Sequence, residues 1–380
     1  MADRPPRTRA RLAAFAVAAS LFGVGIAAVV AEVLVRGITD ETPRFLELVE
    51  LMSADQVVFR PSEDPELLYE IAPNVSISIG LDQAVLAPEE TLYADDPRVI
   101  RTNSLGFRDE ERTEARTDAF RVLCFGGSNT YGAAVSNENT WPAQLQRELR
   151  ARVGPAVEVW NLGHDGYNTR QKVRQTRVAL ERWSPDLLVF QTFNLGPRIM
   201  LPTTPEQCPR WALPEHQGPL GGLYREYLLG APPPGPLQPL FRHSKAWRLA
   251  ALHANRSLAA QQEPRTRRRP INRRAEEVAT ELLSGLIQDV DDRVPVVVFI
   301  PPAGGNPGHV VDSKPRVVDL RKDAWADLEA IPDLQMLHPG RHAYRWYAEH
   351  LAQALVDAEC VGRPGVTPPC RLERARPDGD

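Results

Sequence analysis

The chain has 380 residues, of which 43% are hydrophobic and 25% charged, which is enough material for a large core beside accessory segments. Its formal net charge of -4 and pI near 6.1 argue against nucleic acid as a partner. The eight histidines show no metal-ligand spacing, so we expect neither a metal nor another cofactor.

The N-terminus predicts attachment to a membrane. Residues 1–11 form a basic tail with four arginines, and the next twenty residues, 12–31, carry no charge. About 20 apolar residues cross a bilayer as a helix, and the basic flank favours an inside N-terminus. We therefore expect a cytoplasmic tail, a transmembrane signal anchor over residues 12–35 and export of the rest, which should fold without residues 1–36. The alternatives are a signal peptide cleaved after Val29-Val30-Ala31 and a buried helix of a cytosolic protein.

Residues 40–118 predict a small, partly β extension, and residues 119–357 a larger domain. Within the larger domain, apolar runs alternate with amphipathic segments. The expected strands are 121–124, 157–160, 186–193 and 296–300; the expected helices contain Trp141 to Leu149, Val173 to Trp183, Val278 to Val290 and Tyr347 to Leu355. Strands that alternate with helices imply an α/β fold with a mostly parallel sheet covered on both faces.

Polar segments follow three of these strands. The first strand runs into Phe-Gly-Gly-Ser-Asn-Thr-Tyr-Gly, residues 125–132, whose glycines leave Ser128 exposed at the carboxyl end, where open α/β sheets bind ligands. The second runs into residues 161–169, and the third ends at Asn194. Near the C-terminus, His338-Pro339 precedes the last helix. Taken singly, these segments are also typical of ordinary turns, a capped strand end and the start of a helix.

Taken in this order, the four segments resemble the SGNH/GDSL hydrolase family over roughly residues 95 to 357. The resemblance implies a three-layer α/β/α sandwich of flavodoxin-like type. It implies that Ser128 is a nucleophile and His338 its base. It also implies an oxyanion hole formed by the N–H groups of Ser128 and Gly166 and the side-chain amide of Asn194.

The chain departs from the family pattern at three places. Gly127 stands where the family usually has an aspartate that is not part of the triad, and the segment around Asn194 is degenerate. The family's acid lies three residues before the histidine, where this chain has Gln335. Asp333 is the nearest carboxylate before His338, so we expect it to take the acid's role. A weak or inactive site is the alternative.

Two further segments bear on function. Residues 200–270 form a proline-rich insertion with a helix around Lys245 to Ala259 and a basic run at 265–269. It predicts a lid over the active-site edge, or else a solvated spacer; its arginines could also contact anionic lipid or an acidic glycan. The C-terminal tail, residues 358–380, holds Cys360 and Cys370, whose pairing in a disulfide would suit an oxidising compartment.

These observations predict a membrane-anchored protein with an extracytoplasmic catalytic domain. The expected activity is that of a serine esterase acting on O-acyl groups of envelope or extracellular carbohydrate, on lipid esters or on small carboxyl esters. Two alternatives stay open. One is a catalytically weak or inactive SGNH-like protein that binds a glycan or an envelope partner, and the other is an O-acyltransferase that uses the same serine.

Overall fold

The computed structural model describes residues 6–38 and 58–374, the second range with gaps at 63, 65–66, 68, 82–87, 168, 192–219, 221–235, 260–279 and 305–313. Its centre is a five-stranded sheet in the order β6-β5-β7-β8-β9, in which every neighbouring pair is parallel. The strands are β5 (Phe120–Phe125), β6 (Val157–Asn161), β7 (Leu187–Gln191), β8 (Val296–Ile300) and β9 (Arg316–Asp319).

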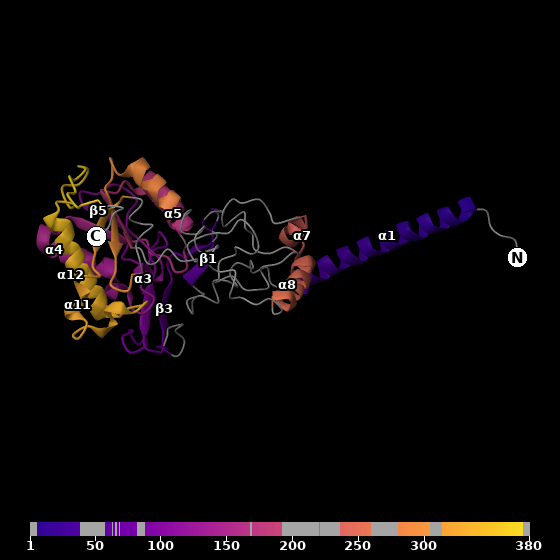
Figure 1. Ribbon diagram of the computed structural model, residues 1–380, viewed down its shortest axis with the longest axis horizontal. Helices are drawn as coiled ribbons and strands as arrows, with labels where there is room; N and C mark the ends of the chain where they lie inside the picture. Colours follow the sequence, from indigo (N-terminus) through magenta and orange to yellow (C-terminus); the bar gives the residue numbers. More distant parts are fainter. Residues whose placement is uncertain are drawn as a thin grey trace.

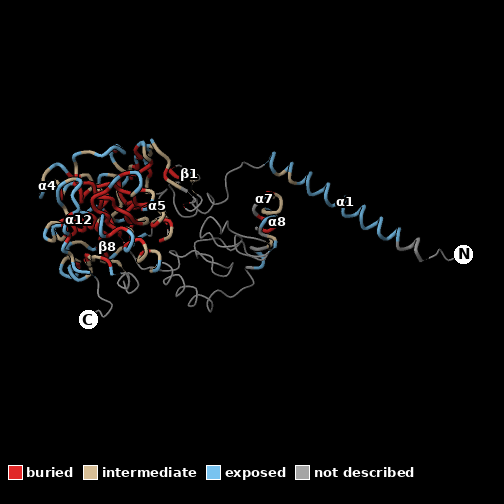
Figure 2. The backbone as a smooth tube through the Cα atoms, turned by 90° about the horizontal axis from the view of Figure 1, so that it is seen from above, coloured by how far each residue is buried: buried red, intermediate tan, exposed pale blue. Residues whose placement is uncertain are grey.

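Helices cover both faces of the sheet (Figure 1). Along β5, Val122 and Cys124 pack under α4 (Trp141–Val153) and α12 (Arg341–Asp357), because alternate side chains of a strand point to opposite faces. Leu123 and Phe125 pack on the other face, under α5 (Thr169–Trp183) and a helix that includes residues 280–290. Figure 2 shows the buried residues gathered in this body.

The three layers confirm the predicted fold class. Four of the five strands were expected from their apolar runs, whereas β9 was missed because its residues Arg-Val-Val-Asp show neither a long apolar run nor a clear alternation. Short elements complete the body on the α12 side: α11 (Ala324–Asp327) and two 3₁₀ turns, η3 (Asn137–Asn139) and η6 (Pro332–Gln335).

Two antiparallel strand pairs precede the sheet. They are β1 (Phe59–Pro61) with β2 (Tyr69–Ile71), and β3 (Ser76–Ile79) with β4 (Arg98–Arg101). Arg108, which follows them, is buried and donates hydrogen bonds to the carbonyls of Tyr131 (3.0 Å) and Gly132 (2.7 Å). A buried guanidinium needs such acceptors, so this contact fixes the segment before the sheet against the loop that follows Ser128. We call this part of the chain, residues 58–118, the N-terminal segment.

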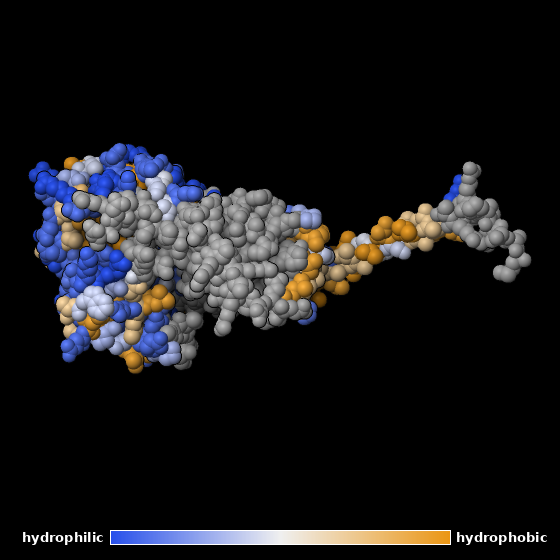
Figure 3. Space-filling model, in the orientation of Figure 1, coloured by the Kyte–Doolittle hydropathy of each residue, from blue (hydrophilic) through white to orange (hydrophobic). Residues whose placement is uncertain are grey.

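Helix α1 (Pro6–Ile38) projects from the end that carries α7 (Gln238–His243) and α8 (Lys245–Ala259), and its surface is largely apolar (Figures 1 and 3). Phe15 and Phe22 are each 72% exposed, which a helix in water would not sustain. The stretch Arg11–Ile38 is long and apolar enough to cross a membrane. It therefore fits a membrane anchor or a signal sequence, and the side on which the remainder lies is not fixed by it.

Glu32, near the C-terminal end of α1, contacts the start of α8. Glu32 accepts hydrogen bonds from the Ser244 hydroxyl (2.8 Å) and from the backbone N–H groups of Lys245 (2.9 Å) and Ala246 (3.0 Å). It thus caps the start of α8, whose bounds agree with the helix expected inside the insertion. Of residues 200–270, the structure describes only 220 and 236–259, so the predicted lid and the basic run lie outside the described residues.

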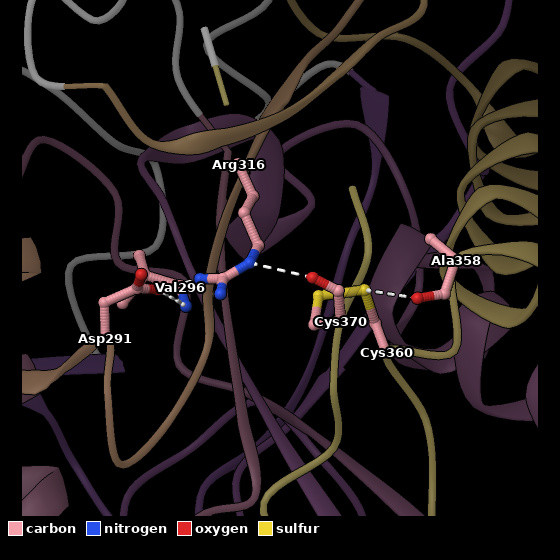
Figure 4. Close-up of a disulfide and its surroundings, with 6 residues drawn as sticks. All are labelled: Asp291, Val296, Arg316, Ala358, Cys360 and Cys370. Atoms are coloured by element: carbon pink, nitrogen blue, oxygen red, sulfur yellow. Dashed lines mark hydrogen bonds and ion pairs between the residues drawn. A yellow bond between two sulfur atoms is a disulfide. The ribbon is translucent and has the colours of Figure 1, made fainter. Parts of the chain in front are cut away.

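The C-terminal tail carries the expected disulfide between Cys360 and Cys370 (Figure 4). The carbonyl of Cys370 accepts a hydrogen bond from Nε of Arg316 at 3.0 Å, and both cysteines belong to the core under α12. The bridge closes a loop after α12, and the hydrogen bond from Arg316 ties that loop to the edge strand β9. Cys124 is a buried free thiol, as expected.

Candidate active site

Ser128 lies at the first position of the short helix α3 (Ser128–Tyr131), which begins directly after β5 and the pair Gly126-Gly127. Cys124 of β5 aligns with Asn161 of β6 and Val189 of β7, so the carboxyl ends of three strands meet at one edge. A Cβ on Gly126 would lie 1.8 Å from Oγ1 of Thr130, so a larger residue could not make this turn. Ser128 is thus placed at the sheet edge, where it is half-buried and not fully exposed as expected.

The His338 ring lies between Ser128 and a carboxylate. Its Nε2 is 2.9 Å from Oγ of Ser128, and its Nδ1 is 3.1 Å from Oε2 of Glu90. The backbone N–H of His338 donates to the other oxygen of Glu90 at 3.0 Å. The His338 and Glu90 side chains are 15% and 7% exposed, so little water competes for these bonds. Hydroxyl, imidazole and carboxylate thus form one hydrogen-bonded chain.

This arrangement corrects the expectation for Asp333. Its Oδ2 accepts a hydrogen bond from the backbone N–H of Gly340 at 2.7 Å, at the start of α12, and burial raises the pKa of its carboxyl. The turn η6 directs Asp333 inward to this helix end, while Gln335, at the position expected for the acid, is exposed. The carboxylate that meets the His338 ring is Glu90, and sequence reasoning missed it.

The segment around Glu90 is held against the start of α12, which follows His338, and against the loop after α3, which follows Ser128. A Cβ on Gly340 would lie 2.1 Å from the carbonyl oxygen of Tyr93, so the turn after Glu90 touches the start of α12 directly. Asp95 accepts hydrogen bonds from the Ser136 N–H and the Asn139 amide, each at 2.8 Å, in the loop after α3. These contacts place the N-terminal segment as one wall of the site.

A second set of contacts ties the histidine loop to the serine turn. The side-chain amide of Asn129, next to Ser128, donates to the carbonyl of Leu337, next to His338, at 2.8 Å. Gln191, the last residue of β7, binds Asn129 and accepts from the Thr130 hydroxyl at 2.6 Å. The Asn129–Leu337 bond and the bonds from Glu90 to His338 therefore both fix the distance between Ser128 and His338.

Of the predicted oxyanion donors, Ser128 and Gly166 lie within the described residues and Asn194 does not. The backbone after β6 runs beside the serine turn, with the His164 N–H donating to the carbonyl of Gly126 at 3.1 Å. Gly166 follows in a turn with a φ of 76°, in the left-handed region that favours glycine. Asn194 lies outside the described residues. Both roles in the oxyanion hole stay predictions.

His164, in the segment that follows β6, is a buried packing residue. Its ring stacks on Tyr167 with centroids 3.6 Å apart and approaches Phe59 of β1 at 5.4 Å. Burial lowers the pKa of His164 to about 3. Within the described parts of the chain, no group of three or more His, Cys, Asp or Glu side chains could hold a metal ion.

Comparisons with known proteins find solved structures that resemble this fold at low sequence identity. No family model matches the sequence, and no curated protein matches it at a significant level. A protein from Desulfitobacterium hafniense described as lipolytic and of the G-D-S-L family is 12% identical, with a TM-score of 0.34, over 62% of this chain and 98% of its own. Esterase EstA from Pseudoalteromonas sp. is 11% identical, with a TM-score of 0.34, over 63% and 97%.

The α/β hydrolase LAE5 from the Lake Arreo metagenome is 12% identical, with a TM-score of 0.35, over 64% of this chain and 97% of its own. At these identities and TM-scores, the likeness does not assign an activity to this chain. Its chemistry has to follow from its own residues.

Proposed function

We propose that this chain is a membrane-anchored serine ester hydrolase of SGNH type, with Ser128 as nucleophile, His338 as general base and Glu90 as the acid behind the histidine. The observation that carries the proposal is the hydrogen-bonded chain from Ser128 Oγ through the His338 ring to the Glu90 carboxylate. In it, a hydroxyl, a titratable ring and a buried carboxylate stand in the order that acyl transfer requires.

Each group has a defined task. Nε2 of His338 takes the proton of Ser128 as Oγ attacks the ester carbonyl, and then gives it to the leaving alcohol. In the second half-reaction, His338 takes a proton from water as the water attacks the acyl carbonyl, and then returns a proton to Ser128 as the acid product leaves. The Glu90 carboxylate accepts a hydrogen bond from Nδ1, which keeps Nε2 free to accept the serine proton and stabilises the imidazolium that forms.

The tetrahedral intermediate carries a negative oxygen, and we assign its stabilisation to the N–H groups of Ser128 and Gly166 and the Asn194 amide. Each such donor is typically worth about 3–4 kcal/mol of barrier. The start of α3 supports this assignment for Ser128, because first-turn N–H groups of a helix have no partner within it.

For substrates, we propose O-acyl groups on envelope or extracellular carbohydrate, or small carboxyl esters. The basic flank of α1 and the Cys360–Cys370 bridge support an extracytoplasmic domain, since disulfides persist in oxidising compartments. Two features favour a non-catalytic binding protein: Gln335 at the acid's position and the degenerate segment around Asn194. Glu90 argues against the first, because it supplies a carboxylate from elsewhere in the chain.

The proposal is tested with a fluorophosphonate, which labels an activated serine, on the detergent-solubilised full chain. We expect the wild type and Ser78→Ala, a control at an exposed serine of β3, to be labelled. Ser128→Ala should not be labelled and should lose at least about 10³-fold in turnover of 4-nitrophenyl butyrate. Labelling of Ser128→Ala at the wild-type level would overturn the proposal.

A further inference from the structure

Lys172 places an ammonium group beside the nucleophile. It lies in the first turn of α5, and a Cβ built on Gly127, the residue before Ser128, would be 3.8 Å from its Nζ. Chain neighbours aside, no other heavy atom of the described residues comes within 4 Å of that Cβ position. Among the described residues, no side chain lies between the backbone at Gly127 and the Lys172 ammonium, so a small space separates the two.

The ammonium has no counterion in the part of the chain that the structure describes. Two other cations of α5 are paired, Arg174 with Asp64 at 2.7 Å and Arg177 with Asp289 at 2.8 Å. Lys172 is partly buried, and burial alone lowers its pKa to about 8, so the group is still mostly protonated near neutral pH. A partly buried cation loses part of its hydration, and an anionic ligand would replace the stabilisation that the lost water supplied.

The residue type is unusual for this chain. Only four of its 45 basic residues are lysines. An arginine would present a wide planar fork, whereas a lysine presents a compact charge with three donors on a flexible stem. A compact donor suits a small space such as the one left by Gly127.

We propose that Lys172 binds an anionic group, a carboxylate or a phosphate, that the substrate carries close to its scissile ester, so that the enzyme selects acidic esters. This inference rests on the proposed esterase function. Neighbouring Cα atoms lie about 3.8 Å apart, so an anion in the space at Gly127 is within one residue's length of Ser128. An ester oxygen on Ser128 and an anion on Lys172 can therefore belong to one small substrate or one sugar unit.

The test compares charged esters with neutral ones. 4-Acetoxybenzoate and 4-acetoxyphenyl phosphate carry the anion on the alcohol side, with methyl 4-acetoxybenzoate as their neutral counterpart. The mono-4-nitrophenyl ester of adipic acid carries it on the acyl side, with 4-nitrophenyl hexanoate as its neutral counterpart. We expect the wild type to prefer at least one anionic ester by about tenfold or more in kcat/KM, the usual scale of a hydrogen bond to a charged group.

Variants assign the preference to one side chain. Lys172→Met keeps the length of the stem and should reduce the anionic-to-neutral ratio of kcat/KM to about one, while Lys172→Arg should restore part of it. Arg177→Met removes one positive charge from the exposed side of the same helix and should keep the wild-type ratio. The preferred member of the panel distinguishes carboxylate from phosphate.

Other outcomes overturn the inference. If the wild type hydrolyses neutral esters through Ser128 without preferring any anionic one, the esterase stands and the role of Lys172 falls. If Lys172→Met slows charged and neutral esters equally, the lysine acts on the oxyanion or on folding, and the inference again falls.

Should no ester be hydrolysed, the esterase proposal fails and calorimetric binding to Ser128→Ala decides for Lys172. Tenfold tighter binding of 4-acetoxybenzoate than of its methyl ester, lost in the Ser128→Ala/Lys172→Met double variant, supports the anion site. Equal binding of the two compounds overturns it.

Discussion

Glu90 holds His338 at two points, although 248 positions separate the two residues along the chain. One carboxylate oxygen faces Nδ1 of the ring, and the other accepts the backbone N–H of the same residue. The carboxylate thus fixes both the backbone and the ring of His338. Because Glu90 precedes the sheet, the N-terminal segment contributes a side chain to the site as well as a wall.

Stability should fall in acid because of His164. Its pKa is about 3 in the folded protein and about 6.5 in an unfolded chain. Between these values only the unfolded chain binds the proton, so the free energy of unfolding should be highest above pH 6.5 and fall toward pH 3, by at most about 1.4 kcal/mol per pH unit from this group.

Urea unfolding of the full chain in detergent, followed by tryptophan fluorescence across this range, measures that slope. His164→Phe keeps a planar ring that does not titrate, so its free energy of unfolding should fall less steeply between pH 6.5 and pH 3 than that of the wild type. His253→Gln, at an exposed position of α8, should keep the wild-type slope. Equal slopes in wild type and His164→Phe would show that His164 is not the group responsible.

Helix α1 should stabilise α8. Glu32→Ala removes the acceptor that caps Ser244, Lys245 and Ala246, and loss of such a cap costs about 1 kcal/mol. Hydrogen exchange of the α8 amides should therefore be faster in this variant of the full chain. Glu349→Ala, which breaks an exposed pair on α12, serves as the matched control. Unchanged exchange in Glu32→Ala would mean that the contact has no energetic weight.

This contact also revises the expected effect of removing residues 1–36. The sheet and its covering helices should still fold, since their two cores contain no residue of α1. Helix α8, however, would lose the Glu32 carboxylate at its start, so the shortened protein should show faster exchange there than the full chain.

Reduction of the disulfide should destabilise the body. The Cys360–Cys370 bridge closes a short loop behind α12, and bridges of this size typically contribute about 2–3 kcal/mol. The melting temperature should fall when dithiothreitol is added to the wild type. The Cys360→Ala/Cys370→Ala double variant should melt low with or without reductant. A reductant effect of equal size in the double variant would assign the loss to another cause.

The sequence was sufficient for the layers because strand and helix periodicities are local. The runs at β5, β7 and β8 are wholly buried, and only Glu158 of β6 is not; such strands read as nearly continuous apolar stretches. Ser128 and His338 could be chosen because each lies next to a feature with a geometric meaning, a glycine turn after a strand and the start of the last helix.

Glu90 could not be chosen in this way. It is one of 49 acidic residues, it lies in a turn without periodicity, and its partner is remote in the sequence. Asp333 was selected for its closeness to His338 along the chain, but closeness in sequence does not fix the direction of a side chain. The turn η6 points that carboxylate at Gly340. The resemblance to the family pattern therefore predicted Ser128 and His338 and missed Glu90.

Asp333 should matter for stability. Its carboxylate is the acceptor for the buried N–H of Gly340, so Asp333→Ala should leave that donor unsatisfied and lower the free energy of unfolding by about 1–2 kcal/mol. Urea unfolding measures the change, with Asp357→Ala at the far end of α12 as the control. A variant as stable as the wild type would contradict the capping role.

The turnover number of Glu90→Gln tests the Ser128–His338–Glu90 site most directly. The substitution keeps the size of the side chain and removes its charge, so His338 loses both its tautomer control and the partner of its imidazolium. On 4-nitrophenyl butyrate, kcat should fall by about 10²- to 10⁴-fold, as for the acid of a serine triad. Asp333→Asn should retain a kcat close to that of the wild type. A Glu90→Gln protein that turns over like the wild type, or an Asp333→Asn protein that loses as much as Glu90→Gln, would contradict the account.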